Sequence, residues 1–404
     1  MKKMFRPRAL PVLLLTPLLA IGTSLIIFTN RRELYLHPLQ VLAVWIPILL
    51  IFQIPFLIRR WRETLIVLGA TALTLLITKY LLGPIILKTI VLPGYELSID
   101  HRPKPQKNSK NEDGVWPDIP SSQYRPEDFN IIFLGDSFTM GLGEPPKAAF
   151  PIQAGAMLQA AYPDKRIRVV NFGWPSSSPV LQLRQLEQIG AKYRPRLVVQ
   201  AFDMTDFQED IRYSAQLRRL GGSDARQLSI FKAVAVRFGQ LFGENDVWEL
   251  LKGRLIFSFP GRNDEVPLKR LFHMCQPLEK SEPLFQTSWN AILETNAFAE
   301  KLGARYVLVV LPRNEQYNRN EGVFEPELDR PECGPYLCEA FKYFEKQALT
   351  AEFPIHSCLQ NFIDSGAART TQAGDPHYNK IGHAIAARAV AGYLISDGVL
   401  EVQR

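Results

Sequence analysis

The chain has 404 residues, 47% of them hydrophobic, which is enough for one large domain with additions or for two small domains. The formal net charge is +7, but residues 1–90 hold eleven Lys and Arg against two Glu and so carry +9. The rest of the chain therefore has a balance of −2, which excludes a broad basic face and gives no reason to expect nucleic acid as a partner.

Three apolar stretches fill the first part of the chain, at residues 9–29, 39–58 and 64–86. Each is close to the ~20 residues that a helix needs to cross a bilayer. A cleaved signal peptide is the alternative for the first stretch, because four basic residues precede it. Its apolar part is longer than a signal core, however, and two more stretches follow. We therefore predict a membrane anchor over residues 1–90 with three transmembrane helices.

The basic residues predict the orientation of this anchor. The amino-terminal tail carries four of them, and the loop at residues 59–63 carries three in five positions. The positive-inside rule places both in the cytoplasm, so the chain after the third helix is expected on the exocytoplasmic side, in the periplasm or outside the cell.

All four cysteines lie in this exocytoplasmic part, and an even number there predicts disulfides, with three connectivities open. They are Cys275, Cys333, Cys338 and Cys358. Their spacing is not that of a zinc site, and no metal is expected.

From residue 100 to about residue 126 the chain is polar and charged and contains prolines, and we predict a linker over residues 91–126. From residue 127 to residue 404 strand patterns alternate with helix patterns, which predicts a parallel sheet in a three-layer α/β/α domain. The alternation breaks at about 208–283, where helical patterns at 228–241 and 247–255 predict an insertion that caps the site. The expected strands are 131–134, 166–171, 197–202, 305–311 and 353–358, and the expected helices are 148–161, 179–193, 284–302, 336–349 and 380–394.

The stretch 130–143, NIIFLGDSFTMGLG, is the segment around which the domain is organised. A short apolar run there is typical of a buried strand, and Gly135, Asp136 and Ser137 follow at its carboxyl end. Ligands of open α/β sheets bind at that end, so Ser137 is a candidate nucleophile. A plain turn is the alternative interpretation, because Gly, Asp and Ser are common turn residues.

The segment GDSFTMGLG resembles the first block of the SGNH/GDSL hydrolase superfamily, in which the serine is the nucleophile. The resemblance implies an SGNH, flavodoxin-like fold over about residues 130–394. It places Asp136 beside the nucleophile in the binding part of the site. The segment Asn171-Phe172-Gly173 is similar to the second block, which implies that the Gly173 N–H contributes to the oxyanion hole.

The third block departs from the family pattern. The family has G-x-N-D, and this chain has Asp203-Met204-Thr205-Asp206. Thr205 stands where the asparagine donates to the oxyanion, and a hydroxyl can donate one hydrogen bond in its place. The alternatives are that another donor replaces the asparagine, or that the activity is weaker or altered. Asp206 matches the pattern, and we expect it to fix the loop.

The segment from residue 374 to residue 383, GDPHYNKIGH, resembles the last block, in which an aspartate and a histidine complete the triad. Asp375 and His377 occupy those positions, with D-x-H in place of the usual D-x-x-H. His383 is the second candidate for the base. An imidazole, with a reference pKa near ~6.5, can take the serine proton at neutral pH, and the carboxylate orients the ring.

A fourth segment, LPRNEQ at residues 311–316, resembles one found in membrane-linked relatives. Arg313 or Glu315 could touch the substrate there. The charged residues of the segment favour a solvated loop instead.

The blocks together imply a membrane-anchored serine esterase with no cofactor, which cleaves acyl esters, O-acetyl or short acyl, of an envelope glycan or lipid. An O-acyltransferase that modifies an envelope polysaccharide would use the same residues, with a sugar hydroxyl as acceptor and a membrane acyl-transfer partner. A non-catalytic envelope protein that retains the fold is the third possibility, supported only by Thr205.

Overall fold

The computed structural model describes residues 100–219, 270–321, 328 and 331–401. The described residues all belong to one compact unit. The three predicted transmembrane helices and the two predicted helices of the insertion lie outside them. Within the described ranges, none of the helices combines the length and the apolar character needed to cross a bilayer.

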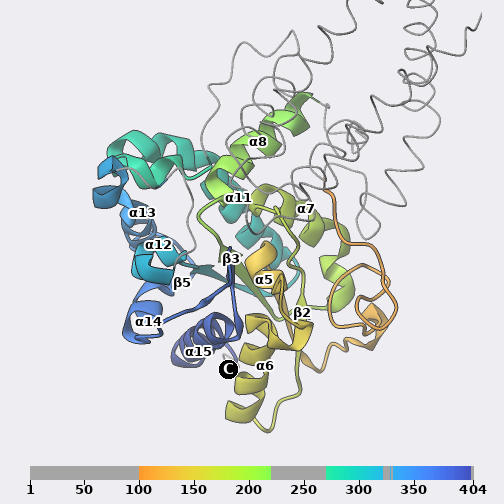
Figure 1. Ribbon diagram of the computed structural model, residues 1–404. Helices are drawn as coiled ribbons and strands as arrows, with labels where there is room; N and C mark the ends of the chain where they lie inside the picture. Colours follow the sequence, from red (N-terminus) through yellow and green to blue (C-terminus); the bar gives the residue numbers. More distant parts are fainter. Residues whose placement is uncertain (1–99, 220–269, 322–327, 329–330, 402–404) are drawn as a thin grey trace, which may run out of the picture. The chain divides into compact units, whose positions relative to one another are not determined.

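Five parallel strands form the central sheet, in the order β2-β1-β3-β4-β5 (Figure 1). Their bounds are β1 Phe129–Leu134, β2 Ile167–Asn171, β3 Leu197–Phe202, β4 Arg305–Val310 and β5 Ile355–Ser357. The apolar runs of the sequence are therefore the strands, as predicted, because a parallel sheet covered on both faces buries nearly every strand residue.

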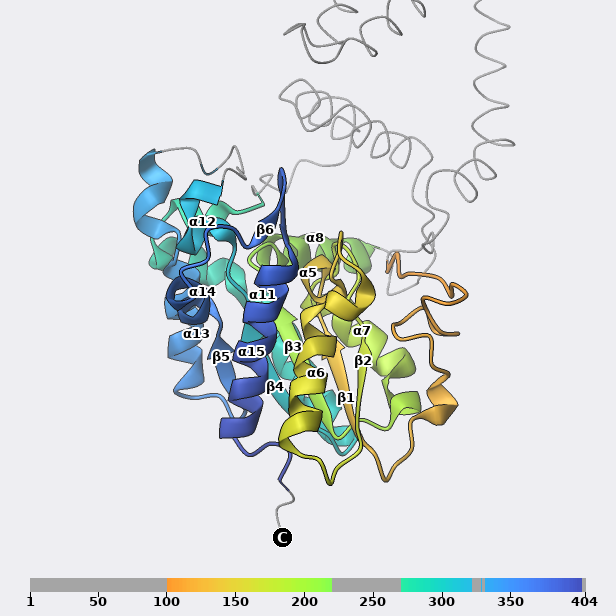
Figure 2. The ribbon, with the colours of Figure 1, turned by 60° about the horizontal axis from the view of Figure 1, so that its bottom comes forward.

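Helices cover both faces of the sheet, and the period of two along β1 divides the core between them. Ile132 and Leu134 pack on the side of α7 and α11, whereas Ile131 and Phe133 pack on the side of α6 and α15. Figure 2 shows α6 and α15 side by side in front of the sheet, with α7 and α11 behind it. The α/β/α layering is thus confirmed. The helices are α5 Ser137–Met140, α6 Phe150–Ala161, α7 Pro179–Ile189, α8 Asp206–Arg219, α11 Leu278–Lys301, α12 Asn314–Tyr317, α13 Glu339–Ala348, α14 Leu359–Asp364 and α15 Lys380–Ser396.

The predicted linker over residues 91–126 is wrong from residue 100 onward, because this part packs on the domain. Val115 and Tyr124 are buried in the core on the α7 side. The backbone of Trp116 pairs with that of Asn171, with N–O distances of 3.3 and 2.8 Å. The apolar residues of the segment are isolated among polar ones. The sequence therefore has no periodic apolar pattern here that could predict packing on the domain.

Helices of the domain extend into the predicted insertion, about residues 208–283, from both of its ends. Residues 206–219 continue the domain as α8, and α11 begins at Leu278, ahead of the predicted start at 284. Pro283 lies inside α11 and does not end it.

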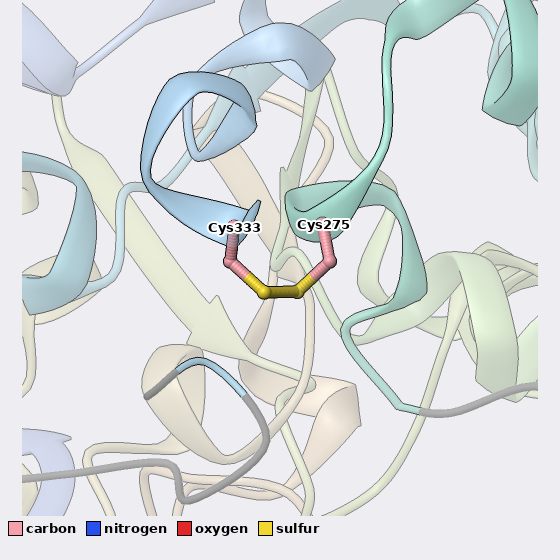
Figure 3. Close-up of a disulfide and its surroundings, with 2 residues drawn as sticks. All are labelled: Cys275 and Cys333. Carbon is pink, nitrogen blue, oxygen red and sulfur yellow. A yellow bond between two sulfur atoms is a disulfide. The ribbon is translucent and has the colours of Figure 1, made fainter. Parts of the chain in front are cut away.

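One disulfide, Cys275–Cys333, joins the short helix η7 (Phe272–Cys275) to η10 (Pro331–Tyr336), as Figure 3 shows. Cys338 and Cys358 are free, so the expectation that all four cysteines pair is wrong. These two thiols pack in the cores on opposite faces of the sheet, which prevents them from meeting.

Candidate active site

Ser137 is the first residue of α5, the short helix that follows β1. Asp136 caps this helix, because its Oδ1 accepts the Phe138 N–H at 2.8 Å. Gly135 allows the turn to be tight, since a Cβ at this position would lie 2.0 Å from Thr139 Oγ1. The strand end and the helix cap therefore fix the serine at the carboxyl edge of the sheet, where the sequence predicted it.

A two-stranded hairpin brings the candidate base His377 to this serine. The hairpin consists of β6 (Thr371–Gln372) and β7 (Asp375–Tyr378). His377 Nε2 lies 2.7 Å from Ser137 Oγ, and His377 Nδ1 is hydrogen-bonded to Asp375 Oδ1. Residues two apart on a strand share a face, so a D-x-H spacing on β7 places both side chains on the same side.

The carboxylate of this group is held in its charged form. Asp375 Oδ1 also accepts the His377 backbone N–H, at 2.8 Å. The pKa of Asp375 is lowered mainly because its side chain accepts the hydrogen bond from the His377 ring. The structure thus brings together Ser137, His377 and Asp375, three residues that the sequence predicted.

His383, the second candidate base, lies elsewhere. It is 1% exposed on α15, and its Nδ1 accepts the Phe150 N–H at 3.3 Å. Burial lowers the pKa of His383 to about 4, so the ring is neutral and does not serve as the base that this site needs.

Gly173 lies against the nucleophile helix, where only a glycine fits. A Cβ there would be 2.5 Å from the Met140 N and 2.9 Å from the Asp136 O. The Gly173 N–H, however, donates to Asn171 Oδ1 at 2.9 Å, while Asn171 Nδ2 donates to Thr139 O at 2.7 Å. The predicted oxyanion donor is in place but is paired with Asn171.

Thr205 makes its hydrogen bonds to Asp203. Its hydroxyl donates to Asp203 Oδ2 at 2.5 Å, and its N–H donates to the same oxygen at 3.1 Å. A hydroxyl has a single hydrogen to donate, so that of Thr205 is directed to Asp203 and away from any substrate. Of the alternatives for the family asparagine, this geometry favours a donor other than the Thr205 hydroxyl.

No protein-family model and no curated protein matches this sequence. Solved structures do match it. One is a putative lipolytic protein of the G-D-S-L family from Desulfitobacterium hafniense DCB-2, with 13% identity, a TM-score of 0.36, and 66% of this chain and 99% of that chain covered. Another is a catalytic mutant of Axe2, an acetylxylan esterase from Geobacillus stearothermophilus, with 16% identity, a TM-score of 0.37, and coverage of 68% and 97%.

The chain resembles the SGNH/GDSL hydrolases. The TM-scores of both solved structures lie below 0.5, so their names carry no conclusion about the function of this chain.

Arg313 is the partner of Asp203, the residue that stands at the glycine position of the third block. Its guanidinium is fully buried, with Nη1 3.0 and 3.3 Å from the two carboxylate oxygens of Asp203, and it lies 5.3 Å from the centre of the Phe138 ring. The predicted solvated loop is therefore wrong, because residues 313–316 are at most 8% exposed. Asp203 at the glycine position was the available signal, since a carboxylate that stays charged when buried needs a cation or hydrogen-bond donors beside it.

Buried carboxyl groups gather behind the nucleophile. Asp206 fixes the third-block loop as expected, because its Oδ2 accepts the Asp203 N–H at 3.0 Å. Burial, and then the nearby carboxylates, raise the pKa of Asp136 and of Asp206 well above the ordinary range. Burial also acts on Asp203, but the Arg313 guanidinium and the donors of Thr205 lower its pKa overall. Among Asp136, Asp203 and Asp206, the ionised form is therefore favoured only at Asp203, which is paired with Arg313.

The described part of the chain contains no group of three His, Cys, Asp or Glu side chains arranged to hold a metal ion.

Proposed function

We propose that the chain is a serine esterase that works through an acyl-enzyme on Ser137. The observation that carries the proposal is the continuous contact from Ser137 Oγ to His377 Nε2, at 2.7 Å, and from His377 Nδ1 to Asp375. A serine needs such a base to become a nucleophile, and the base needs a partner to hold its tautomer.

In the proposed reaction, Ser137 Oγ attacks the ester carbonyl while its proton passes to His377 Nε2. The imidazolium then gives this proton to the departing alkoxide, and an acyl-serine ester remains. Water, deprotonated by the same nitrogen, attacks the acyl-serine and releases the acid, and the proton returns to Ser137. Asp375 keeps its charge throughout and stabilises the imidazolium.

The oxyanion donor is proposed to be the Ser137 N–H. The first amide of a helix has no carbonyl within the helix to bond, so it remains available to a developing negative charge. Gly173 would add a second donor on release of its N–H from Asn171.

We further propose that the enzyme is anchored in the membrane with this domain on the exocytoplasmic side. The three apolar stretches of residues 1–90 and their basic flanks support this location. The Cys275–Cys333 disulfide supports it as well, because disulfides persist in oxidising compartments. An O-acetyl or short acyl ester of an envelope glycan or lipid is the proposed substrate.

The test is turnover of short acyl esters by the full-length chain in detergent, with and without an oligosaccharide acceptor. We expect hydrolysis without acceptor, and complete loss of fluorophosphonate labelling in Ser137→Ala. Ser396→Ala, which changes an exposed serine at the end of α15, is the matched control and should label normally. Product formed only with the acceptor would instead make the enzyme an acyltransferase. Normal labelling of Ser137→Ala would refute the proposal.

A further inference from the structure

The histidine and aspartate of the site lie on a hairpin that is separate from the central sheet. Within the described residues, β7 pairs only with β6. A lone two-stranded hairpin is marginally stable in water, and catalytic geometry tolerates little displacement. Other contacts must therefore hold β6 and β7 in position.

Glu321 supplies four of these contacts from outside the hairpin. It ends the short helix η8 (Arg319–Glu321), which follows β4 and α12, and it is 7% exposed. Its Oε2 accepts the N–H groups of Thr370 and Thr371 at 3.0 and 2.9 Å and the Thr371 hydroxyl at 2.6 Å. Its Oε1 accepts the Thr370 hydroxyl at 2.7 Å.

All four donors belong to two consecutive residues, Thr370 and Thr371, that are themselves fully buried. Three of the bonds go to Oε2 and one goes to Oε1. Hydrogen bonds to a charged acceptor are stronger than neutral ones, so this end of β6 is held firmly.

The clamped residues lead directly to the base. Thr371 pairs with Tyr378, the residue after His377, and Gln372 pairs with Asp375. Gln372 Nε2 also donates to Leu142 O at 2.6 Å, in the turn after the nucleophile helix. Glu321 therefore fixes one end of β6, and Gln372 fixes the other against the segment that carries Ser137. Figure 2 shows β6 at the same end of the domain as α5 and α12.

We propose that Glu321 is a positioning residue that holds the β6–β7 hairpin so that His377 meets both Ser137 and Asp375. This inference rests on the proposed esterase function. Glu321 does not touch the triad, and it acts on it only through Thr370 and Thr371. Its loss is expected to let β6 shift, lengthening the Ser137–His377 contact and weakening the Asp375–His377 hydrogen bond.

The test compares Glu321→Ala, Glu321→Gln and Thr371→Val in the full-length chain. Glu294→Ala, at an exposed position on α11, is the matched control. We measure the rate of fluorophosphonate labelling per folded molecule, the kcat and KM for a short ester, the pH–rate profile, and the downfield proton resonance of the Asp375–His377 hydrogen bond. Thermal unfolding gives the folded fraction.

We expect Glu321→Ala to lose roughly a hundredfold in kcat with little change in KM, as a small displacement of a catalytic group does. The acid limb of its pH–rate profile should move to lower pH, because a loosened Asp375 stabilises the imidazolium less, and the downfield resonance should broaden or disappear. In Glu321→Gln the amide oxygen can take the three bonds of Oε2, and the amide nitrogen can donate to the Thr370 hydroxyl. This variant should therefore recover most of the rate.

Thr371→Val removes one of the four bonds and should give an intermediate loss, which tests the inference even where Glu321→Ala fails to fold. Wild-type labelling and an unchanged resonance in folded Glu321→Ala would overturn the inference, and so would normal kinetics in Thr371→Val beside an unfolded Glu321→Ala. The resonance does not depend on turnover. An inactive wild type that shows the resonance, and loses it in Glu321→Ala, would therefore refute the esterase and retain the positioning role.

Discussion

The polar side chains on the two sides of the candidate site differ in their direction relative to Ser137 and in their exposure to solvent. On the hairpin side, His377 and Asp375 point toward Ser137, and Asp375 is about half exposed, with 47% of its side chain accessible. On the side of the third block, the polar groups turn away from the serine. Thr205 donates to Asp203, and Asp203 is paired with a fully buried Arg313.

The difference suggests that the charged groups on one side serve the reaction and that those on the other side stabilise the fold. In the proposed mechanism the half-exposed Asp375 acts on His377, the group that transfers the proton, so changes to Asp375 should alter rate more than stability. The Asp203–Arg313 pair is enclosed, and a buried pair that loses one member leaves an uncompensated charge. Changes there should alter stability first. Four substitutions test this division, from the largest expected effect to the smallest.

Asp375→Asn should lower kcat by roughly 10⁴-fold, because an amide allows the wrong tautomer of His377 to persist. The thermal unfolding of the variant should remain close to that of the wild type, since the side chain is half exposed. Ester turnover and melting curves measure both quantities, with the exposed Asp364→Asn as control. A variant that melts early in proportion to its lost activity would break the comparison.

Arg313→Met should destabilise the domain by about 3–5 kcal/mol, because it leaves Asp203 charged and buried without its partner. Urea unfolding followed by tryptophan fluorescence measures the loss. The double variant Asp203→Asn/Arg313→Met should recover part of it, and Arg319→Met, at an exposed position, should be neutral. Equal stability of Arg313→Met and the wild type would show that the ion pair contributes nothing.

Thr205→Val should destabilise the domain by about 1.5–3 kcal/mol, the usual value for a hydrogen bond to a charged group, while kcat changes little. The same unfolding and turnover assays apply. A fall of a hundredfold or more in kcat, with stability retained, would restore Thr205 as an oxyanion donor and contradict the geometry described above.

Asp210→Asn should change how stability depends on pH. Burial raises the pKa of Asp210 from 3.8 to about 7, so its favourable contribution is complete below pH 3.8 and is lost as the pH rises toward 7. The neutral asparagine keeps an acceptor for the Ser178 hydroxyl and the Val180 N–H, at 2.5 and 2.9 Å. The stability of the variant relative to the wild type should therefore rise by up to about 1.4 kcal/mol per pH unit over this window.

The exposed Asp164→Asn is the control for this pH series, which is followed by urea unfolding. A constant difference between Asp210→Asn and the wild type from pH 4 to 7 would show that Asp210 titrates normally. Asp375, whose pKa is lowered, should give the opposite trend, with stability lost as the pH falls through the lowered value.

The sequence by itself determined the sheet and the local positions of Ser137, Asp375 and His377. β1, β3 and β4 are short and mostly apolar, which is typical of parallel strands with both faces buried. Ser137 is bound to its strand end by local turn chemistry, and Asp375 and His377 share a face of β7 because they are two residues apart. These features depend on short-range geometry, which a sequence pattern records.

Only the tertiary structure decided where the remaining polar groups point. Arg313 meets Asp203 across 110 residues of sequence, and Glu321 meets Thr370 across 49. Gly173 and Thr205 were predicted as oxyanion donors from their positions in the family blocks. In the structure Gly173 donates to Asn171 and Thr205 donates to Asp203. Local sequence does not decide which partner a hydrogen-bond donor meets, because packing brings that partner within reach. The isolated apolar residues after residue 100 likewise joined the core through contacts with residues distant in the sequence.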